Sequence, residues 1–328
     1  MNHDVVVIHH KNCLDGIAAA WSAWKYFEGK VDLVPAQYGD NFEEMFGEGF
    51  SDLIGKRVFC LDFAFDLVTT KQLMGVCQLV VLDHHDTAWK NLNGIASSSI
   101  DKWPGAISLF DIDNFKNDSL IVVDQTKSGA VLSWLFFFGK DGVSPPSALS
   151  FVQDRDLWKF KHPETRPWTA AAFSHELTVE NFDMLMQTPV HEVVLEGKAI
   201  QRHMDKTVNL LAKSARTFRL DEYAVPIVNC NALFASDLGH KLGEGEMFSI
   251  TYNDSHNARQ FSLRTRHPDI KVNEIAERFG GGGHPGAAGF RISFEDDHFH
   301  HSHLYLDSVE YIKNGKDWIP NPLYKGSK

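Results

Sequence analysis

The sequence has few of the features that mark secreted, membrane-spanning or zinc-ribbon proteins. Its 328 residues include only four cysteines, with no CxxC pair among them: Cys13, Cys60, Cys77 and Cys230. Such sparse spacing argues against a disulfide framework and against a zinc ribbon. No run of residues reaches the apolar length of a membrane span, and the N-terminus begins with a strand-like run instead of a signal sequence. We therefore expect a cytoplasmic protein with no membrane partner.

Basic residues are also in the minority. The chain has 32 lysines and arginines against 43 aspartates and glutamates, which gives a formal net charge of −11. Long nucleic acids are normally bound through a basic surface. The acidic balance therefore weighs against a long duplex as partner, while a small phosphorylated ligand held through metal ions stays compatible with it.

Apolar runs alternate with amphipathic stretches over the first 85 residues. The runs are Val5 to Ile8, Ile17 to Phe27, Val31 to Pro35, Val58 to Leu61, Leu67 to Met74 and Leu79 to Leu82. This alternation is typical of βαβ units and predicts an α/β domain with a parallel sheet. We assign that domain to residues 1–190.

A second, smaller domain is expected after a long helix. The stretch from Val190 to Leu211 has few helix breakers, so we place a helical linker at residues 191–220. Short strand-like runs and one helix follow, which predicts an α+β domain over residues 221–328. They are Val225 to Val228, Met247 to Tyr252, Gln260 to Thr265 and Gly289 to Ile292, with the helix near Val272 to Phe279.

Three of the apolar runs in the first domain end at residues of the types that commonly bind metal ions in proteins. His9-His10 follows the first run, Asp62 follows Cys60-Leu61, and Asp83-His84-His85 follows Leu82. Ligands of open α/β sheets bind beyond the carboxyl ends of the strands. Polar residues are common at strand ends, but three such endings favour a metal site over a solvated rim.

A glycine-dense segment, Gly280 to Phe290, carries one imidazole and lies in the predicted second domain. Glycine permits close approach and unusual dihedrals, so the backbone N–H groups of this segment can wrap a phosphate. A plain turn is the alternative, although four successive glycines before His-Pro-Gly are hard to explain as a turn. In the nearby run Phe261 to Arg266, alternation places Arg264 on the same face as Arg266, and arginine suits bidentate phosphate contacts.

Taken in this order, Asp83-His84-His85 and the glycine segment resemble the motifs of the DHH/DHHA1 phosphoesterase superfamily. That superfamily includes RecJ-type exonucleases, nano-RNA hydrolases and phosphodiesterases of linear or cyclic dinucleotides. The resemblance covers nearly the whole chain. It implies a DHH catalytic domain, a DHHA1 substrate domain and two divalent metal ions, with Mn²⁺ expected first and Mg²⁺, Zn²⁺ or Fe²⁺ as alternatives.

The resemblance also implies roles for particular residues. The implied metal ligands are His10, Cys13, Asp15, Asp62, His84 and Asp154. Asp62 would bridge the two ions, and the catalytic set would be completed by His84, by Asp83 as the residue that orients an imidazole, and by His85. For His85 two roles stay open, namely contact with the scissile phosphate and stabilisation of the leaving oxygen.

The first motif departs from the family pattern. The superfamily usually has His-x-Asp-x-Asp-Gly, and this chain has His9-His10-Lys11-Asn12-Cys13-Leu14-Asp15-Gly16. Asp15-Gly16 matches, but Cys13 stands at the position of the first aspartate, and His10 can serve only if the loop is one residue longer. A thiolate would favour zinc or iron over manganese or magnesium, and the alternative is that Cys13 simply packs as a small buried residue.

By the same resemblance, the second domain would grip a terminal phosphate through Arg264, His284 and the amides of Gly281, Gly282 and Gly283. The expected activity is hydrolysis of short linear ribonucleotides such as pGpG to mononucleotides by water that two metals activate. The alternatives are a phosphatase of 3′,5′-bisphosphonucleotides such as pAp, a cyclic-dinucleotide phosphodiesterase, and a nucleotide-sensing module without activity. Association of two copies of the chain into a homodimer is left open.

Overall fold

The computed structural model describes residues 2–109, 119–220, 223–294, 311–314 and 317–320 of the chain. The chain divides into two compact units, Met1–Gln201 and Arg202–Lys328. The division falls inside helix α9 (Val190–Ala212), which matches the long helix expected from Val190 to Leu211.

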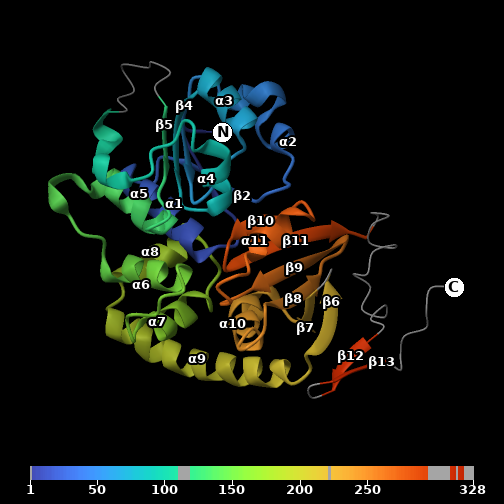
Figure 1. The fold of residues 1–328 in the computed structure, drawn as a ribbon. Helices are drawn as coiled ribbons and strands as arrows, with labels where there is room; N and C mark the ends of the chain where they lie inside the picture. The colour runs from blue at the N-terminus through green and yellow to red at the C-terminus, as the bar shows by residue number, and fades with distance from the viewer. Residues whose placement is uncertain (1, 110–118, 221–222, 295–310, 315–316, 321–328) are drawn as a thin grey trace. The chain divides into compact units, whose positions relative to one another are not determined.

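The first unit is built on a five-stranded sheet in which all strands run parallel, in the order β2-β1-β3-β4-β5 (Figure 1). The strands are β1 (Val5–His10), β2 (Asp32–Ala36), β3 (Arg57–Leu61), β4 (Gln78–Asp83) and β5 (Leu120–Val123). Every residue of the strand β4 is buried, as expected of a parallel strand covered on both faces. This sheet confirms the predicted α/β domain.

Helices cover both faces of the sheet. The core on one face contains side chains from α1 (Leu14–Tyr26), α5 (Gly129–Phe138), α6 (Ser147–Asp156), α7 (Thr165–Ala172) and α8 (Val179–Gln187). The core on the other face contains side chains from α2 (Phe42–Phe46), α3 (Leu67–Val76) and α4 (Asp86–Leu92). Successive residues of β1 alternate between the two cores, so that Val5 and Val7 enter the first and Val6 and Ile8 the second.

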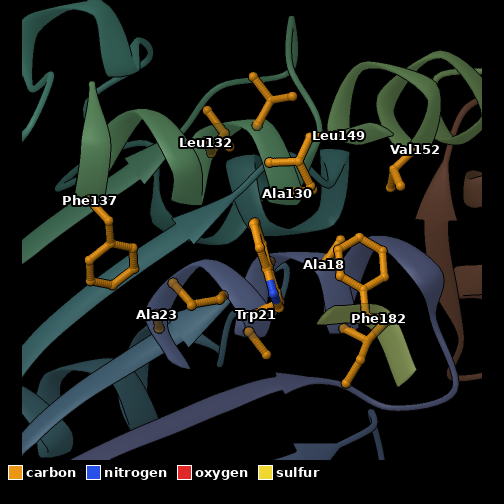
Figure 2. Close-up of a cluster of buried hydrophobic side chains, with 14 of the residues drawn as sticks. Ala18, Trp21, Ala23, Ala130, Leu132, Phe137, Leu149, Val152 and Phe182 are labelled. Atoms are coloured by element: carbon orange, nitrogen blue, oxygen red, sulfur yellow. The ribbon is translucent and has the colours of Figure 1, made fainter. Parts of the chain in front are cut away.

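Trp21 of α1 lies in the core on the first face (Figure 2). Its ring stacks on Trp134 of α5 with the ring centroids 6.0 Å apart, and it meets Phe182 of α8 edge-on at 5.7 Å. The indole Nε1 donates a hydrogen bond of 2.9 Å to Asp183 Oδ1, and Lys25 Nζ lies 3.1 Å from the same oxygen. A large buried ring with a satisfied N–H thus ties α1 to α5 and α8.

The second unit contains a six-stranded mixed sheet in the order β10-β11-β9-β8-β7-β6. Its strands are β6 (Arg216–Leu220), β7 (Tyr223–Asn229), β8 (Ser249–Asp254), β9 (Ala258–Arg264), β10 (Gly282–His284) and β11 (Ala287–Ser293). Helices α10 (Ala232–Leu242) and α11 (Val272–Glu277) complete this α+β unit, in which only β7 and β8 pair in parallel among the described residues. Further along, β12 (Tyr311–Asn314) and β13 (Asp317–Pro320) pair with each other.

Among the helices in the described ranges, none is both long enough and apolar enough to cross a lipid bilayer.

Candidate metal centre

The parallel sheet brings the three polar strand ends of the first unit to one edge. β1 pairs with β3 and β3 pairs with β4, with Ile8 opposite Cys60 and Leu61 opposite Leu82. His10, Asp62 and the Asp83-His84-His85 segment therefore come next to one another at the carboxyl end of the sheet. His10 and His85 thus belong to one cluster in the structure, although more than seventy residues separate them in the sequence.

Asp62 and His84 lie at the middle of this cluster, and both side chains are almost fully buried. His84 Nε2 lies 3.1 Å from Asp62 Oδ1, and His10 Nδ1 lies 3.7 Å from Asp62 Oδ2. Two groups of side chains here could each bind a metal ion, because the potential ligand atoms within each group lie within 4.8 Å of one another. The first group is His10, Cys13 and Asp62. The second group is Asp15, His84 and Asp156. Because Asp62 contacts His84, the two groups adjoin.

The backbone at Asp62 is unusual. Its φ of 56° lies in the left-handed region, which costs a non-glycine residue of order 1 kcal/mol or more. The first residue of α5, Gly129, also lies very close to Asp62, because a Cβ added to Gly129 would be 2.5 Å from Asp62 Cβ. Glycine at position 129 is therefore what allows α5 to pass beside Asp62.

Asp15 has a structural contact as well as a place in the cluster. Its carboxylate accepts hydrogen bonds from the backbone N–H groups of Gly129 at 2.6 Å and Ala130 at 3.2 Å, so it caps the N-terminus of α5. The helix dipole favours a negative charge at that end. Burial nevertheless raises the pKa of Asp15 well above its ordinary value, and the neighbouring carboxylates of Asp62 and Asp156 raise it further.

The charges in the cluster are coupled. Burial alone would raise the pKa of Asp62, but the imidazoles of His10 and His84 hold that pKa well below its ordinary value. Burial alone would lower the pKa of His84, but the surrounding carboxylates, with Asp156 first, raise it to about 10. Burial and the same carboxylates raise the pKa of the Cys13 thiol well above its ordinary value.

His85 is held by the fully buried Asp83. Its Nδ1 donates to Asp83 Oδ1 at 2.6 Å, and the same oxygen accepts the backbone N–H of His85 at 3.1 Å. Burial would lower the pKa of His85, and the Asp83 carboxylate raises it. This contact holds the imidazole ring of His85 in one orientation.

The carboxylate that α6 supplies to the cluster comes from Asp156, whereas the sequence predicted Asp154. Asp156 Oδ2 lies 3.5 Å from His84 Nε2. Asp154 instead accepts hydrogen bonds from Lys161 N at 2.9 Å, His162 N at 3.0 Å and Thr165 Oγ1 at 2.6 Å. Both oxygens of Asp154 thus accept hydrogen bonds in the turn after α6, whereas Asp156 is the carboxylate of α6 that lies beside His84.

The donor set fits divalent metal ions. The buried atoms Asp62 Oδ2 and His10 Nδ1 have no hydrogen-bond partner within the described part of the chain. Buried polar atoms are normally paired, and a cation bound by lone pairs on both would satisfy them. Carboxylates and imidazoles suit Mn²⁺, Fe²⁺ or Zn²⁺, so this cluster could hold a divalent metal ion.

In the second unit, the glycine segment forms a close hairpin. A Cβ on Gly281 would lie 2.1 Å from the carbonyl oxygen of Gly289, and Gly283 has a φ of 137°. Ala287 of β11 pairs with His284 on one side and with Arg264 on the other. His284 and Arg264 thus flank Ala287 in the sheet, and Arg264 donates to Ser236 Oγ at 2.9 Å.

Comparison with other sequences yields two curated relatives and no matching family model. An uncharacterized protein, R106, of Acanthamoeba polyphaga mimivirus is 24% identical over 314 residues, which cover 88% of this chain and 67% of R106. Oligoribonuclease NrnB of Bacillus subtilis is 35% identical over 105 residues, which cover 31% of this chain and 24% of NrnB. The second match thus spans about a quarter of that protein.

Solved structures with a similar fold include a pGpG-specific phosphodiesterase, PggH of Vibrio cholerae, with a TM-score of 0.41 and 14% identity over 89% of this chain and 94% of that one. RecJ of Thermus thermophilus in complex with Mn²⁺ has a TM-score of 0.47 and 13% identity over 90% of this chain and 50% of RecJ. At these identities the likeness concerns the fold alone.

Two residues of the site were missed by sequence reasoning. Asp156 carries a visible signal, because it stands in an Asp-Arg-Asp triplet whose two carboxylates a single arginine cannot explain. Gly129 carries none, because its role depends on a contact with Asp62 across 67 residues of sequence.

Proposed function

We propose that this protein is a metal-dependent phosphoesterase that hydrolyses short linear ribonucleotides, such as pGpG, to mononucleotides. The observation that carries the proposal is the buried cluster around Asp62 and His84, whose carboxylates and imidazoles meet at the carboxyl edge of a parallel sheet. Such a cluster suits two divalent cations and has no comparable use in packing, since burying so many acidic groups is unfavourable without a cation.

In this proposal the metal ligands are His10, Asp15, Asp62, His84 and Asp156, with Cys13 beside His10. Two divalent cations held by these residues would supply a nucleophile at neutral pH and neutralise charge on the phosphoryl oxygens. Asp62 lies between the two ligand groups and is the residue placed to serve both. The left-handed backbone at Asp62 fixes the direction in which its carboxylate leaves the strand.

His85 has a separate task. Asp83 holds the proton on Nδ1 of His85, so that Nε2 is presented to the substrate in one orientation. We assign this nitrogen to the scissile phosphate or the leaving oxygen. In the second unit, Arg264 and His284 would bind the terminal phosphate, with the backbone of Gly282 and Gly283 beside them, because arginine is suited to phosphate oxygens. The N–H group of Gly281, which was predicted to share this role, donates instead to the Ala276 carbonyl oxygen at 3.0 Å.

Short substrates are favoured by the charge of the chain. A net charge of −11 opposes the approach of a long polyanion, whereas one or two phosphates are neutralised locally by bound cations. Linear dinucleotides therefore rank first, ahead of longer oligoribonucleotides.

The test is product analysis with Mn²⁺ on a panel of pGpG, longer oligoribonucleotides, cyclic di-GMP and pAp. We expect mononucleotides from pGpG, with rates that fall as length increases. The variant Asp62→Ala should lose activity by several orders of magnitude, while Asp52→Ala, at an exposed position, should keep it. Release of phosphate from pAp alone would indicate a bisphosphonucleotide phosphatase. Binding of pGpG without turnover, with metal bound, would indicate a sensor.

A further inference from the structure

A pocket of about 270 Å³ opens beside the β1–α1 turn of the first unit. Its floor is formed by the sheet, where His9 of β1 pairs with Pro35 of β2 and the adjacent Leu33 pairs with Val7. Leu177, Thr178 and Val179, at the start of α8, cover it.

His9 is the notable polar residue on its floor. The residue is only 5% exposed, and its Nδ1 contacts the carbonyl oxygen of His10 at 3.3 Å. Within the described ranges, no hydrogen bond is formed by the other ring nitrogen, Nε2. His9 lines the pocket, so this nitrogen is available to form a hydrogen bond with a ligand atom there.

The pocket is continuous with the candidate metal centre. His10 and Cys13 line the pocket, and both also belong to the group of ligand atoms that includes Asp62. A molecule in the pocket would thus lie against the same turn that contributes to the metal centre.

The volume and lining of the pocket suit a heterocycle. Apolar side chains of Ile17, Leu33 and Leu177 form its walls, and Asn12 and Glu180 add polar groups. A cavity of about 150 Å³ holds benzene, so the larger volume here is sufficient for a ring system of two fused rings. Apolar walls with a few placed polar groups are typical of sites for such ligands.

We propose that this pocket binds a nucleobase of the substrate, with His9 Nε2 as its hydrogen-bond partner. The inference rests on the proposed function, because it takes the base to belong to the nucleotide whose phosphate lies at the metal centre. His9 thereby becomes a residue that sets specificity, and metal binding is left to His10.

Two variants and a substrate without a base test the proposal. Leu177→Trp fills the pocket, and His9→Phe keeps a ring of similar shape but removes the nitrogen. Met184→Trp is the matched control, because it places the same indole on α8 at a position that is 44% exposed. The substrates are pGpG and bis(p-nitrophenyl) phosphate, both with Mn²⁺.

We expect KM for pGpG to rise about tenfold or more in Leu177→Trp and His9→Phe, as for other altered specificity pockets. The rate on bis(p-nitrophenyl) phosphate should stay at the level of the original protein, and Met184→Trp should match that protein on both substrates. An unchanged KM for pGpG in both variants, or an equal loss on both substrates, would overturn the proposal.

If the original protein hydrolyses neither substrate, the proposed function fails and the pocket is tested by calorimetry with GMP. Binding that Leu177→Trp abolishes and Met184→Trp retains would support the base pocket independently of catalysis. No binding to the original protein, or equal binding to Leu177→Trp, would overturn it.

Discussion

Removing the carboxylate of Asp154 should weaken the fold, whereas removing that of Asp156 should weaken metal binding. Asp154 accepts three hydrogen bonds, from Lys161 N, His162 N and Thr165 Oγ1, at 2.6 to 3.0 Å. A hydrogen bond to a charged group contributes about 1.5–3 kcal/mol, and bonds that share one carboxylate do not add fully. We therefore expect Asp154→Ala to lower the free energy of unfolding by about 3 kcal/mol.

Asp156 has a different environment. Its side chain is 25% exposed and faces His84 and other carboxylates. Asp156→Ala removes one of several like charges, so we expect the free energy of unfolding without metal to change by less than about 1 kcal/mol. The two variants thus predict opposite patterns, although the residues stand two positions apart.

Urea unfolding with and without Mn²⁺ separates these patterns. A ligand present at about a hundred times its Kd stabilises the folded state by about 2.7 kcal/mol. Asp156→Ala should lose most of the stabilisation by Mn²⁺. Asp154→Ala should still be stabilised by Mn²⁺, although its free energy of unfolding without metal is lower than that of the original protein. Asp154→Asn, which keeps one acceptor oxygen, should fall between Asp154→Ala and the original protein in stability. The reasoning would be refuted if Asp154→Ala kept its stability without metal and lost the gain from manganese.

Three further outcomes are expected. Gly129→Ala should reduce dinucleotide hydrolysis by about 100-fold, because its Cβ would displace Asp62; Gly75→Ala, where a Cβ meets nothing within 4 Å, is the control, and equal rates for the two would count against the contact. Burial would raise the pKa of Asp183, but hydrogen bonds from Trp21 and Lys25 lower it. The stabilising effect of Asp183 should therefore be complete above about pH 4 and be lost as pH falls through the lower folded value. Urea titrations of Asp183→Ala at about pH 7 and about pH 3 check this, and a stability difference that stayed constant would contradict it. Finally, Cys13→Asp should shift metal preference from zinc toward manganese in a competition assay if the thiolate binds metal, and an unchanged preference would assign Cys13 to packing.

The sheet and the centre of the site were predictable because they follow from local sequence. An apolar run followed by Asp62, or by Asp83-His84-His85, marks the carboxyl end of a buried strand, and parallel pairing then places such ends together. The glycine segment was similarly predictable as a close backbone approach, and Gly281 and Gly283 show why glycine is required there.

The choice between Asp154 and Asp156 depended on features that sequence does not reveal. α6 ends at Asp156, and the turn that follows has positive φ at Trp158 and Phe160, of 53° and 45°. That turn folds back onto Asp154 and uses its carboxylate. The resemblance pointed to the first aspartate of the pair, whereas the rotation of the helix end decides which one faces His84.

The left-handed backbone at Asp62 also limits how this chain can change over generations. Glycine and asparagine adopt that conformation at little cost, whereas alanine and especially valine do so poorly. A descendant that no longer needed the carboxylate would drift toward glycine or asparagine at this position. The left-handed backbone conformation at position 62 would then remain in proteins that no longer carry a carboxylate there.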